Sequence, residues 1–231
     1  MSIEAKLAEI SQQIAELTRQ YHRSDHSVRL LAVSKTKPLQ ALEVAYQAGQ
    51  RLFGENYVQE AVDKRQALAH LTDIEWHFIG PIQSNKSRLI AEHMDWVHTI
   101  DREKIARRLN EQRPENMSPL NVCIQVNISG EESKSGVSIE ALKTLVALIQ
   151  TLPNLRLRGL MAIPAPQESL EAQMKVYAPL HQAFLELAVT DSMIDTLSIG
   201  MSGDLPAAIA SGSTMVRVGT AIFGARDYPA L

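Results

Sequence analysis

Eight short apolar segments with the composition of β-strands recur along this chain, and helix-like segments lie between most of them. They span residues 27–34, 51–55, 75–80, 95–100, 121–128, 155–161, 195–200 and 214–219. Strands that alternate with helices are typical of βαβ units and a parallel sheet. Eight such units in 231 residues predict an α/β protein with one closed TIM-type (β/α)8 barrel, a fold that commonly has about this length.

A doubly wound open sheet is the main alternative to the barrel. The dinucleotide-binding form of that sheet needs a G-x-G-x-x-G turn after its first strand, and the segment at 27–34 is followed by no such turn. The sequence also lacks a low-complexity linker, and residues 111–119 read as a loop. We therefore expect a single domain that covers residues 1–231.

An extra helix is predicted at the N-terminus, over residues 2–21. Its apolar residues recur at alternating spacings of four and three, which places them on one helical face: Ile3, Leu7, Ile10, Ile14 and Leu17. The pattern covers barely more than two heptads, so docking onto the barrel is favoured over a coiled coil.

Charge and composition exclude several classes of partner. The net charge is −3 without a strong basic block, which argues against binding to nucleic acid or a membrane surface. The single cysteine, Cys123, lies in an apolar run and is expected to be buried. The first ten residues are too charged for a signal peptide, and no apolar run approaches the roughly 20 residues of a membrane helix. We expect a cytoplasmic protein.

Lys35 ends the first predicted strand, where a barrel usually carries its chemistry. It shares a strand face with Leu31 and Val33. An amine backed by apolar side chains is partly desolvated, which favours its neutral, nucleophilic form, and a nearby Lys37 would act in the same direction. Such an amine forms Schiff bases with carbonyl groups. The alternative is a solvated lysine that only closes the strand.

Two loops have the features of phosphate-binding loops. After the seventh strand, a Gly/Ser loop leads into a helix near Asp204, and backbone N–H groups at a helix start bind anions. Asp204 would compete with a phosphate if it pointed inward, and ordinary helix capping is the alternative. After the eighth strand, Gly219 and Thr220 offer bare backbone and a hydroxyl. Barrels often hold phosphate with these two loops.

Other polar residues at strand positions are less specific. Arg217 interrupts the eighth apolar segment and needs an acceptor, most commonly a carboxylate. Asn56 ends the second strand, where it could line the barrel mouth or serve in a turn. The histidines at 77, 93 and 98 lack the spacing of metal ligands, so we predict no metal site and interpret His77 as a satisfied strand histidine.

A Schiff-base lysine, two phosphate loops and an arginine suggest one ligand that has an aldehyde at one end and a phosphate at the other. Pyridoxal 5′-phosphate fits, with its ring nitrogen as the acceptor for Arg217. The chain also resembles the pyridoxal-phosphate homeostasis proteins, which are related to the N-terminal barrel of alanine racemases. The motifs that carry the resemblance are AVSKTKP (32–38), FGENYVQE (53–60), WHFIGPIQSNK (76–86), NISGEESKSG (127–136), RGLMAIP (158–164), LSIGMS (197–202) and VRVGTAIFGAR (216–226).

The resemblance implies a role for each site residue. Lys35 would carry the cofactor as a Schiff base, Asn56 would lie beside it, and Arg217 would meet the ring nitrogen. The phosphate would be held by Ser202, Gly219 and Thr220. The family often has an acidic residue directly after GMS, whereas this chain has Gly203 and then Asp204, which leaves the local helix cap open.

The implied function is a monomeric carrier or buffer of the cofactor in vitamin B6 and amino-acid homeostasis, without catalytic residues. Arg217 cannot give up its proton to the ring nitrogen, and no second domain is expected to supply a catalytic acid. Apo-enzymes would be the recipients. A racemase-like enzyme and a cofactor-free Schiff-base aldolase remain alternatives. A weaker hypothesis is a second, transient cofactor site at Lys37 and Lys134.

Overall fold

The strands of the computed structural model, which describes residues 1–130 and 135–225, form a closed parallel barrel. The strands follow one another in chain order, and β8 pairs with β1, so that Leu31 lies opposite Arg217. This closure confirms the predicted (β/α)8 barrel and excludes the open sheet. The strands are β1 (Arg29–Val33), β2 (Leu52–Glu55), β3 (Glu75–Phe78), β4 (Trp96–Ile100), β5 (Leu120–Gln125), β6 (Leu155–Met161), β7 (Thr196–Ser198) and β8 (Met215–Val218).

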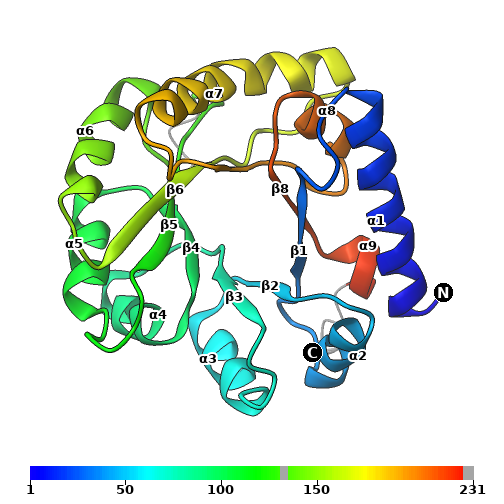
Figure 1. Cartoon of the computed structure of the whole chain (residues 1–231), viewed down its shortest axis with the longest axis horizontal. Coiled ribbons are helices and arrows are strands. Elements are labelled where there is room, and N and C mark those ends of the chain that lie inside the picture. The colour runs from blue at the N-terminus through cyan, green and yellow to red at the C-terminus, as the bar shows by residue number, and fades with distance from the viewer. Residues whose placement is uncertain (131–134, 226–231) are drawn as a thin grey trace, which may run out of the picture.

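Helices surround the barrel as an outer ring (Figure 1). Helix α7 begins earlier than its apolar pattern indicates, because the Ser169 hydroxyl caps it by accepting the Ala172 N–H (3.2 Å), and it continues through Pro179. Helices α4 and α5 are short and were not predicted. The helices after β1 to β8 are α2 (Leu39–Gln47), α3 (Val58–Ala67), α4 (Ser87–His93, preceded by a 3-10 turn at Ser84–Lys86), α5 (Glu103–Gln112), α6 (Ile139–Gln150), α7 (Leu170–Thr190), α8 (Leu205–Ala210) and α9 (Thr220–Phe223).

Helix α1 (Ile3–Gln20) docks onto the barrel's outer ring beside α8 and α9 (Figure 1). Its buried face consists of the predicted stripe, Leu7, Ile10, Ile14 and Leu17. The segment after α1 is tied down as well, because the Arg23 guanidinium donates to the Ile209 carbonyl (3.1 Å) at the end of α8. The docking prediction is therefore confirmed, and α1 braces the two helices that follow the predicted phosphate loops.

The barrel interior has apolar and polar parts. One apolar group joins Leu31, Ile79 and Met215, and a second joins Trp96, Cys123 and Met161. Cys123 is fully buried as predicted, and burial raises the pKa of its thiol to about 12. Polar side chains are buried alongside these two groups: His77, His98, Ser198 and Arg217. Burial of such groups is costly unless they bond to one another.

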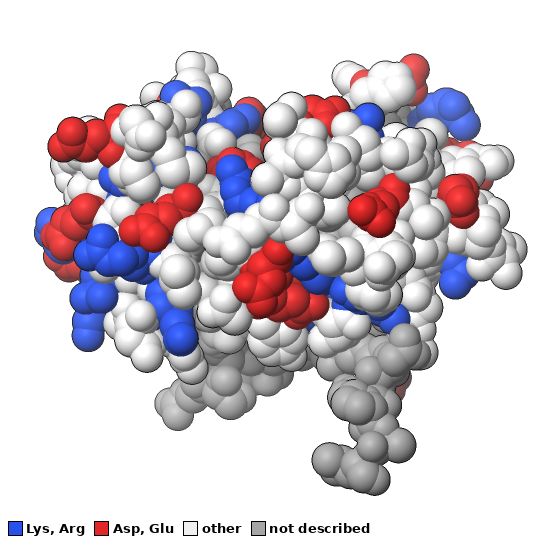
Figure 2. Space-filling view, turned by 90° about the horizontal axis from the view of Figure 1, so that it is seen from below, with Lys and Arg blue, Asp and Glu red and all other residues white. Residues whose placement is uncertain are grey.

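Surface charges do not form a single-sign patch on the face seen from below, where positive and negative side chains are interspersed (Figure 2). Over residues 1–130 and 135–225, no helix combines the length and apolar character needed to cross a membrane. The same residues contain no group of three or more His, Cys, Asp or Glu side chains arranged to hold a metal ion.

Candidate functional site

Lys35 lies directly beyond β1, at the carboxyl end of the barrel, as the sequence predicts. The strand period places it on the face of Leu31 and Val33, which pack in the barrel interior. Its side chain is half-buried. The next residue, Thr36, has a φ of 61°, which is uncommon for a residue other than glycine. The chain therefore turns sharply immediately after Lys35.

A buried ionic cluster fixes the backbone on both sides of Lys35. The Lys64 ammonium, from α3, donates to Glu55 Oε1 (2.8 Å), to Glu60 Oε1 (2.7 Å) and to the Ser34 carbonyl (2.7 Å). The Ser34 hydroxyl donates to Glu55 Oε1 (2.5 Å), and the Thr36 N–H donates to Glu60 Oε1 (2.6 Å). All three ammonium N–H groups are thus used, and β1, β2 and α3 are joined next to Lys35.

Two of the three charged groups in this cluster, Lys64 and Glu55, are held away from water, whereas the Glu60 side chain is 24% exposed. The side chains of Lys64 and Glu55 are 6% and 0% exposed. Burial raises the pKa of Glu55, while the Lys64 ammonium and the Ser34 hydroxyl oppose that rise. Each group depends on its partners, because an unpaired charge at this depth would be strongly destabilising.

Asn56 follows β2 and lines two cavities at the barrel mouth. One, of about 270 Å³, is shared with Ile79, Thr99 and Gln125. Asn56 Oδ1 is buried and has no hydrogen-bond partner among the residues described. A buried acceptor of this kind calls for a ligand or a water molecule.

The position of Asn56 depends on a close approach by Gly80, which follows β3. A Cβ atom on Gly80 would lie 2.2 Å from the Asn56 carbonyl oxygen. Only glycine therefore lets the loops after β2 and β3 meet as they do.

Arg217 lies in the barrel wall with 4% of its surface exposed. Its acceptors are not the carboxylate that we expected as the commonest partner. Nη1 donates to the Ser198 carbonyl (2.7 Å) and hydroxyl (2.8 Å), and Nη2 donates to the Ala162 carbonyl (3.0 Å). Burial lowers the pKa of Arg217, but a guanidinium stays protonated in proteins. A positive charge that no hydrogen-bonded carboxylate neutralises therefore remains in the barrel wall.

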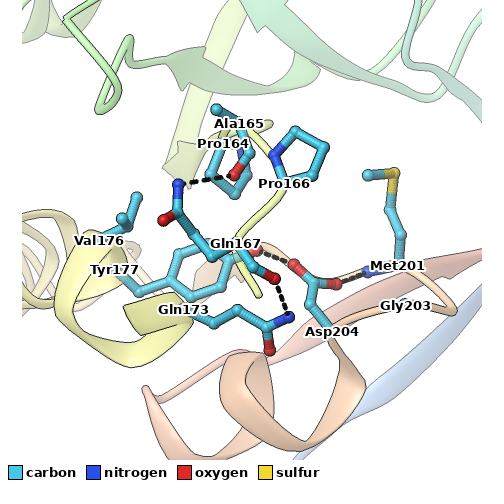
Figure 3. A pocket seen from close by; sticks show the side chains of 10 residues that line it. All are labelled: Pro164, Ala165, Pro166, Gln167, Gln173, Val176, Tyr177, Met201, Gly203 and Asp204. Carbon is cyan, nitrogen blue, oxygen red and sulfur yellow. Dashed lines mark hydrogen bonds between the residues drawn. The ribbon is translucent and has the colours of Figure 1, made fainter. Parts of the chain in front are cut away.

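The loop after β7 exposes Ser202. It also turns the Asp204 side chain away from the start of α8 and toward Tyr177 and Met201 (Figure 3). Asp204 precedes α8 but makes no side-chain bond to that helix. Its carboxylate instead accepts the Met201 N–H (2.6 Å) and the Tyr177 hydroxyl (2.5 Å). Burial, with the Asp204 charge, raises the pKa of Tyr177. The helix-capping alternative is therefore wrong: Asp204 closes its own loop and fastens it to α7.

The loop after β8 places Gly219 just before α9 and Thr220 as its first residue. The Thr220 side chain is exposed, as is that of Ser202 on the neighbouring loop. A Cβ on Gly219 would approach the Val33 carbonyl oxygen to 3.0 Å. This contact would be tighter than is usual for a Cβ atom, so a bulky residue here would crowd the end of β1 close to Lys35.

The comparisons with known proteins agree with this arrangement. The family model "Alanine racemase, N-terminal domain" matches residues 6–227. The protein named pyridoxal phosphate homeostasis protein in Pasteurella multocida is 57% identical over 231 residues, 99% of each chain. Its namesake in Escherichia coli K12 is 58% identical over 224 residues, 96% of each.

This chain belongs to the pyridoxal phosphate homeostasis protein family.

Solved structures show how far this family's barrel is shared. The structure of PipY from Synechococcus elongatus with PLP bound has a TM-score of 0.83 at 36% identity, and covers 96% of this chain and 100% of that one. The same protein without PLP gives a TM-score of 0.85. Alanine racemase from E. faecalis, at 19% identity and a TM-score of 0.64, shows the fold alone. Homeostasis proteins and alanine racemases therefore have the same barrel.

Sequence reasoning missed the groups that support the predicted site. Lys64, Glu55 and Glu60 hold the Lys35 segment, and Ser198 and His98 lie beside Arg217. For Glu55, His98 and Ser198 the available signal was their position, since a polar residue at an inward position of a barrel strand must find partners there. Lys64 and Glu60 lie on α3 and gave no such signal. Lys37, proposed for a second site, is buried and donates to the Ala225 carbonyl (2.5 Å). Lys134 lies outside the described residues.

We expect Lys64→Met to lower the free energy of unfolding by about 3–5 kcal/mol, because it leaves the buried Glu55 carboxyl group without its ammonium partner. Urea denaturation measures this loss. Arg107→Met is the matched control, since it breaks an exposed i,i+4 pair with Glu103 and should cost less than about 0.5 kcal/mol. Equal losses for the two variants would mean that the buried cluster does not support the segment around Lys35.

Proposed function

We propose that this chain binds pyridoxal 5′-phosphate through Lys35 and acts as a carrier or buffer in vitamin B6 homeostasis. One observation carries the proposal: a rigidly held lysine at the end of β1 shares the barrel mouth with two loops that expose Ser202 and Thr220. The name of the relatives and the PLP bound to PipY support it. We further propose that the chain acts as a monomeric single domain in the cytoplasm and passes the cofactor to apo-enzymes.

The residues present fit this cofactor. Asn56 supplies a buried acceptor that has no partner among the described groups. Hydroxyl groups stand at the starts of α8 and α9, where the first backbone N–H groups have no partner within their own helix. Arg217 uses three N–H groups on carbonyl and hydroxyl oxygens of Ser198 and Ala162, and a guanidinium has five. Two donors are therefore left for a ring nitrogen.

Each residue then has a physical task. The cofactor would supply an aldehyde that condenses with the Lys35 amine and releases one water molecule. Ser202, Gly219 and Thr220 would hold the phosphate through hydroxyl and backbone N–H groups. The Lys64 cluster keeps the backbone around Lys35 fixed, so that little ordering is needed when the cofactor binds.

We also propose that the chain does not turn over amino acids at enzymatic rates. Arg217 faces the proposed ring position with a proton that it cannot give up. A racemase needs a second acid–base group on the opposite face of its substrate. Tyr46 and Tyr177 donate their hydroxyls to Asp73 and Asp204, and neither lines the two cavities beside Asn56. Tyr57 lines the second of these cavities but is exposed, so it is the tyrosine that the exchange experiment below tests.

We expect Lys35→Ala to give a folded protein that lacks the visible absorption of a lysine-bound cofactor, because the attaching amine is gone. The absorption spectrum and the thermal midpoint of the purified protein measure this. Lys86→Ala is the matched control, since it removes an exposed lysine beside another mouth cavity and should leave the protein coloured. A coloured Lys35→Ala variant would overturn the assignment.

We expect Ser202→Ala and Thr220→Val each to weaken pyridoxal-phosphate binding about 10-fold, the usual range for a lost bond to a charged acceptor. Binding of unphosphorylated pyridoxal should be unchanged. Ser192→Ala serves as the control, because this exposed serine precedes β7 and so lies at the opposite end of that strand from Ser202. Titrations followed by absorbance give the dissociation constants. If both ligands lose affinity equally, these residues do not contact the phosphate.

A racemase-like enzyme is the second candidate, because the alanine racemase domain model covers residues 6–227. Exchange of the α-hydrogen of alanine with deuterated solvent, followed by NMR on the cofactor-loaded protein, separates the two functions. The carrier predicts exchange far slower than about 1 per second, a rate at the low end for enzymes. Exchange at or above that rate, and absent from Lys35→Ala, would establish the enzyme instead.

A further inference from the structure

A chain of buried polar groups crosses the barrel interior from Arg217 to the opposite end. Ser198 Oγ accepts from Arg217 Nη1 (2.8 Å) and lies 2.8 Å from Nδ1 of His98. Nε2 of His98 lies 2.9 Å from Nδ1 of His77. These hydrogen-bonded side chains, each at most 4% exposed, thus join β8, β7, β4 and β3.

This series of polar groups ends at Glu75, the first residue of β3. His77 Nε2 lies 3.7 Å from Glu75 Oε2, too far for a hydrogen bond, and has no hydrogen-bond partner among the described residues, so His77 is not the fully satisfied histidine that we expected. Glu75 also accepts from Arg29 Nη2 (2.7 Å) and Trp96 Nε1 (3.1 Å). His77 and then Arg29 lower the pKa of Glu75 to about 2, so the carboxylate is charged near neutral pH.

The number of N–H and O–H donors in this series of hydrogen bonds fixes which group donates and which accepts at each step. Burial lowers the pKa of His77 and, more strongly, of His98, so both rings are neutral and each has one donor and one acceptor. A charged Glu75 favours an N–H on the His77 nitrogen that faces it. His77 Nδ1 then accepts from His98 Nε2–H, and His98 Nδ1 accepts from the Ser198 hydroxyl.

The direction in which the Ser198 hydroxyl points determines how Ser198 can bind Arg217. A serine hydroxyl has one hydrogen and two lone pairs. With its hydrogen engaged by His98, the Ser198 oxygen presents a lone pair to the guanidinium, which can only donate. Hydrogen bonds in such a chain also strengthen one another by about 10–30%. Without His98 the hydroxyl is free to rotate, and this contact to Arg217 loses its fixed geometry.

We propose that His98 and His77 are positioning residues that act through Ser198 to hold Arg217 in the orientation that meets the cofactor's ring nitrogen. The inference rests on the proposed cofactor site. His77 and His98 are separated from the ligand by Ser198 and Arg217, so neither is a catalytic residue. Their effect should therefore be specific to the ring nitrogen.

The test compares His98→Leu with His98→Asn, which are similar in shape but differ in hydrogen bonding. The Asn side-chain oxygen can accept from Ser198 in place of Nδ1, whereas Leu cannot. We expect His98→Leu to bind pyridoxal 5′-phosphate about 10-fold more weakly than His98→Asn, with a shifted absorption maximum. Both variants should bind equally an analogue in which a C–H group replaces the ring nitrogen.

Ser198→Ala gives an independent route if His98→Leu does not fold. It should show the same nitrogen-specific loss, and the double variant with His98→Leu should lose no more than either single variant, because both cut one chain. Equal affinities of His98→Leu and His98→Asn for the cofactor, or equal losses for cofactor and analogue, would overturn the inference. A wild-type protein that fails to bind the cofactor would overturn the proposed function instead.

Discussion

The three hydrogen bonds of the Lys64 ammonium hold in place the end of the barrel that carries Lys35. They join the Ser34 carbonyl, Glu55 and Glu60, so the last residues of β1, the end of β2 and helix α3 cannot move independently. Lys35 lies between Ser34 and Thr36, both bonded to this cluster. A buried ion cluster is costly to assemble, and in this chain it fixes the geometry of a short turn that must present one lysine to the barrel mouth.

The second constraint is the buried charge of Arg217. It is balanced by carbonyl and hydroxyl oxygens of Ser198 and Ala162, and the Asp204 carboxylate acts on it electrostatically without a hydrogen bond. In the proposed complex, a carboxylate beside the ring nitrogen would let that nitrogen hold a proton, whereas the Arg217 guanidinium would not.

The barrel could be predicted from the sequence, and so could the placement of most of the predicted site residues at the ends of strands. Both depend on local patterns, namely the alternation of side chains along a strand and the alternation of strands with helices. The sequence was insufficient for Asp204, whose carboxylate bonds to Tyr177 on α7 rather than to its own helix. The role of Lys64 could not be predicted either. Its sequence position is that of an ordinary lysine on a helix surface, and its partners come together only when α3 packs against β1 and β2. The pairing of His77 with His98 depends on barrel closure, which brings inward positions of different strands together.

The most direct test of the account is to locate the covalently bound cofactor. The purified protein, loaded with pyridoxal 5′-phosphate, is reduced with borohydride and digested, and the modified peptide is identified by mass spectrometry. The account predicts a pyridoxyl adduct on Lys35, held at the barrel mouth by the cluster around Lys64. An adduct confined to Lys37 or Lys134, or the absence of any adduct, would contradict it.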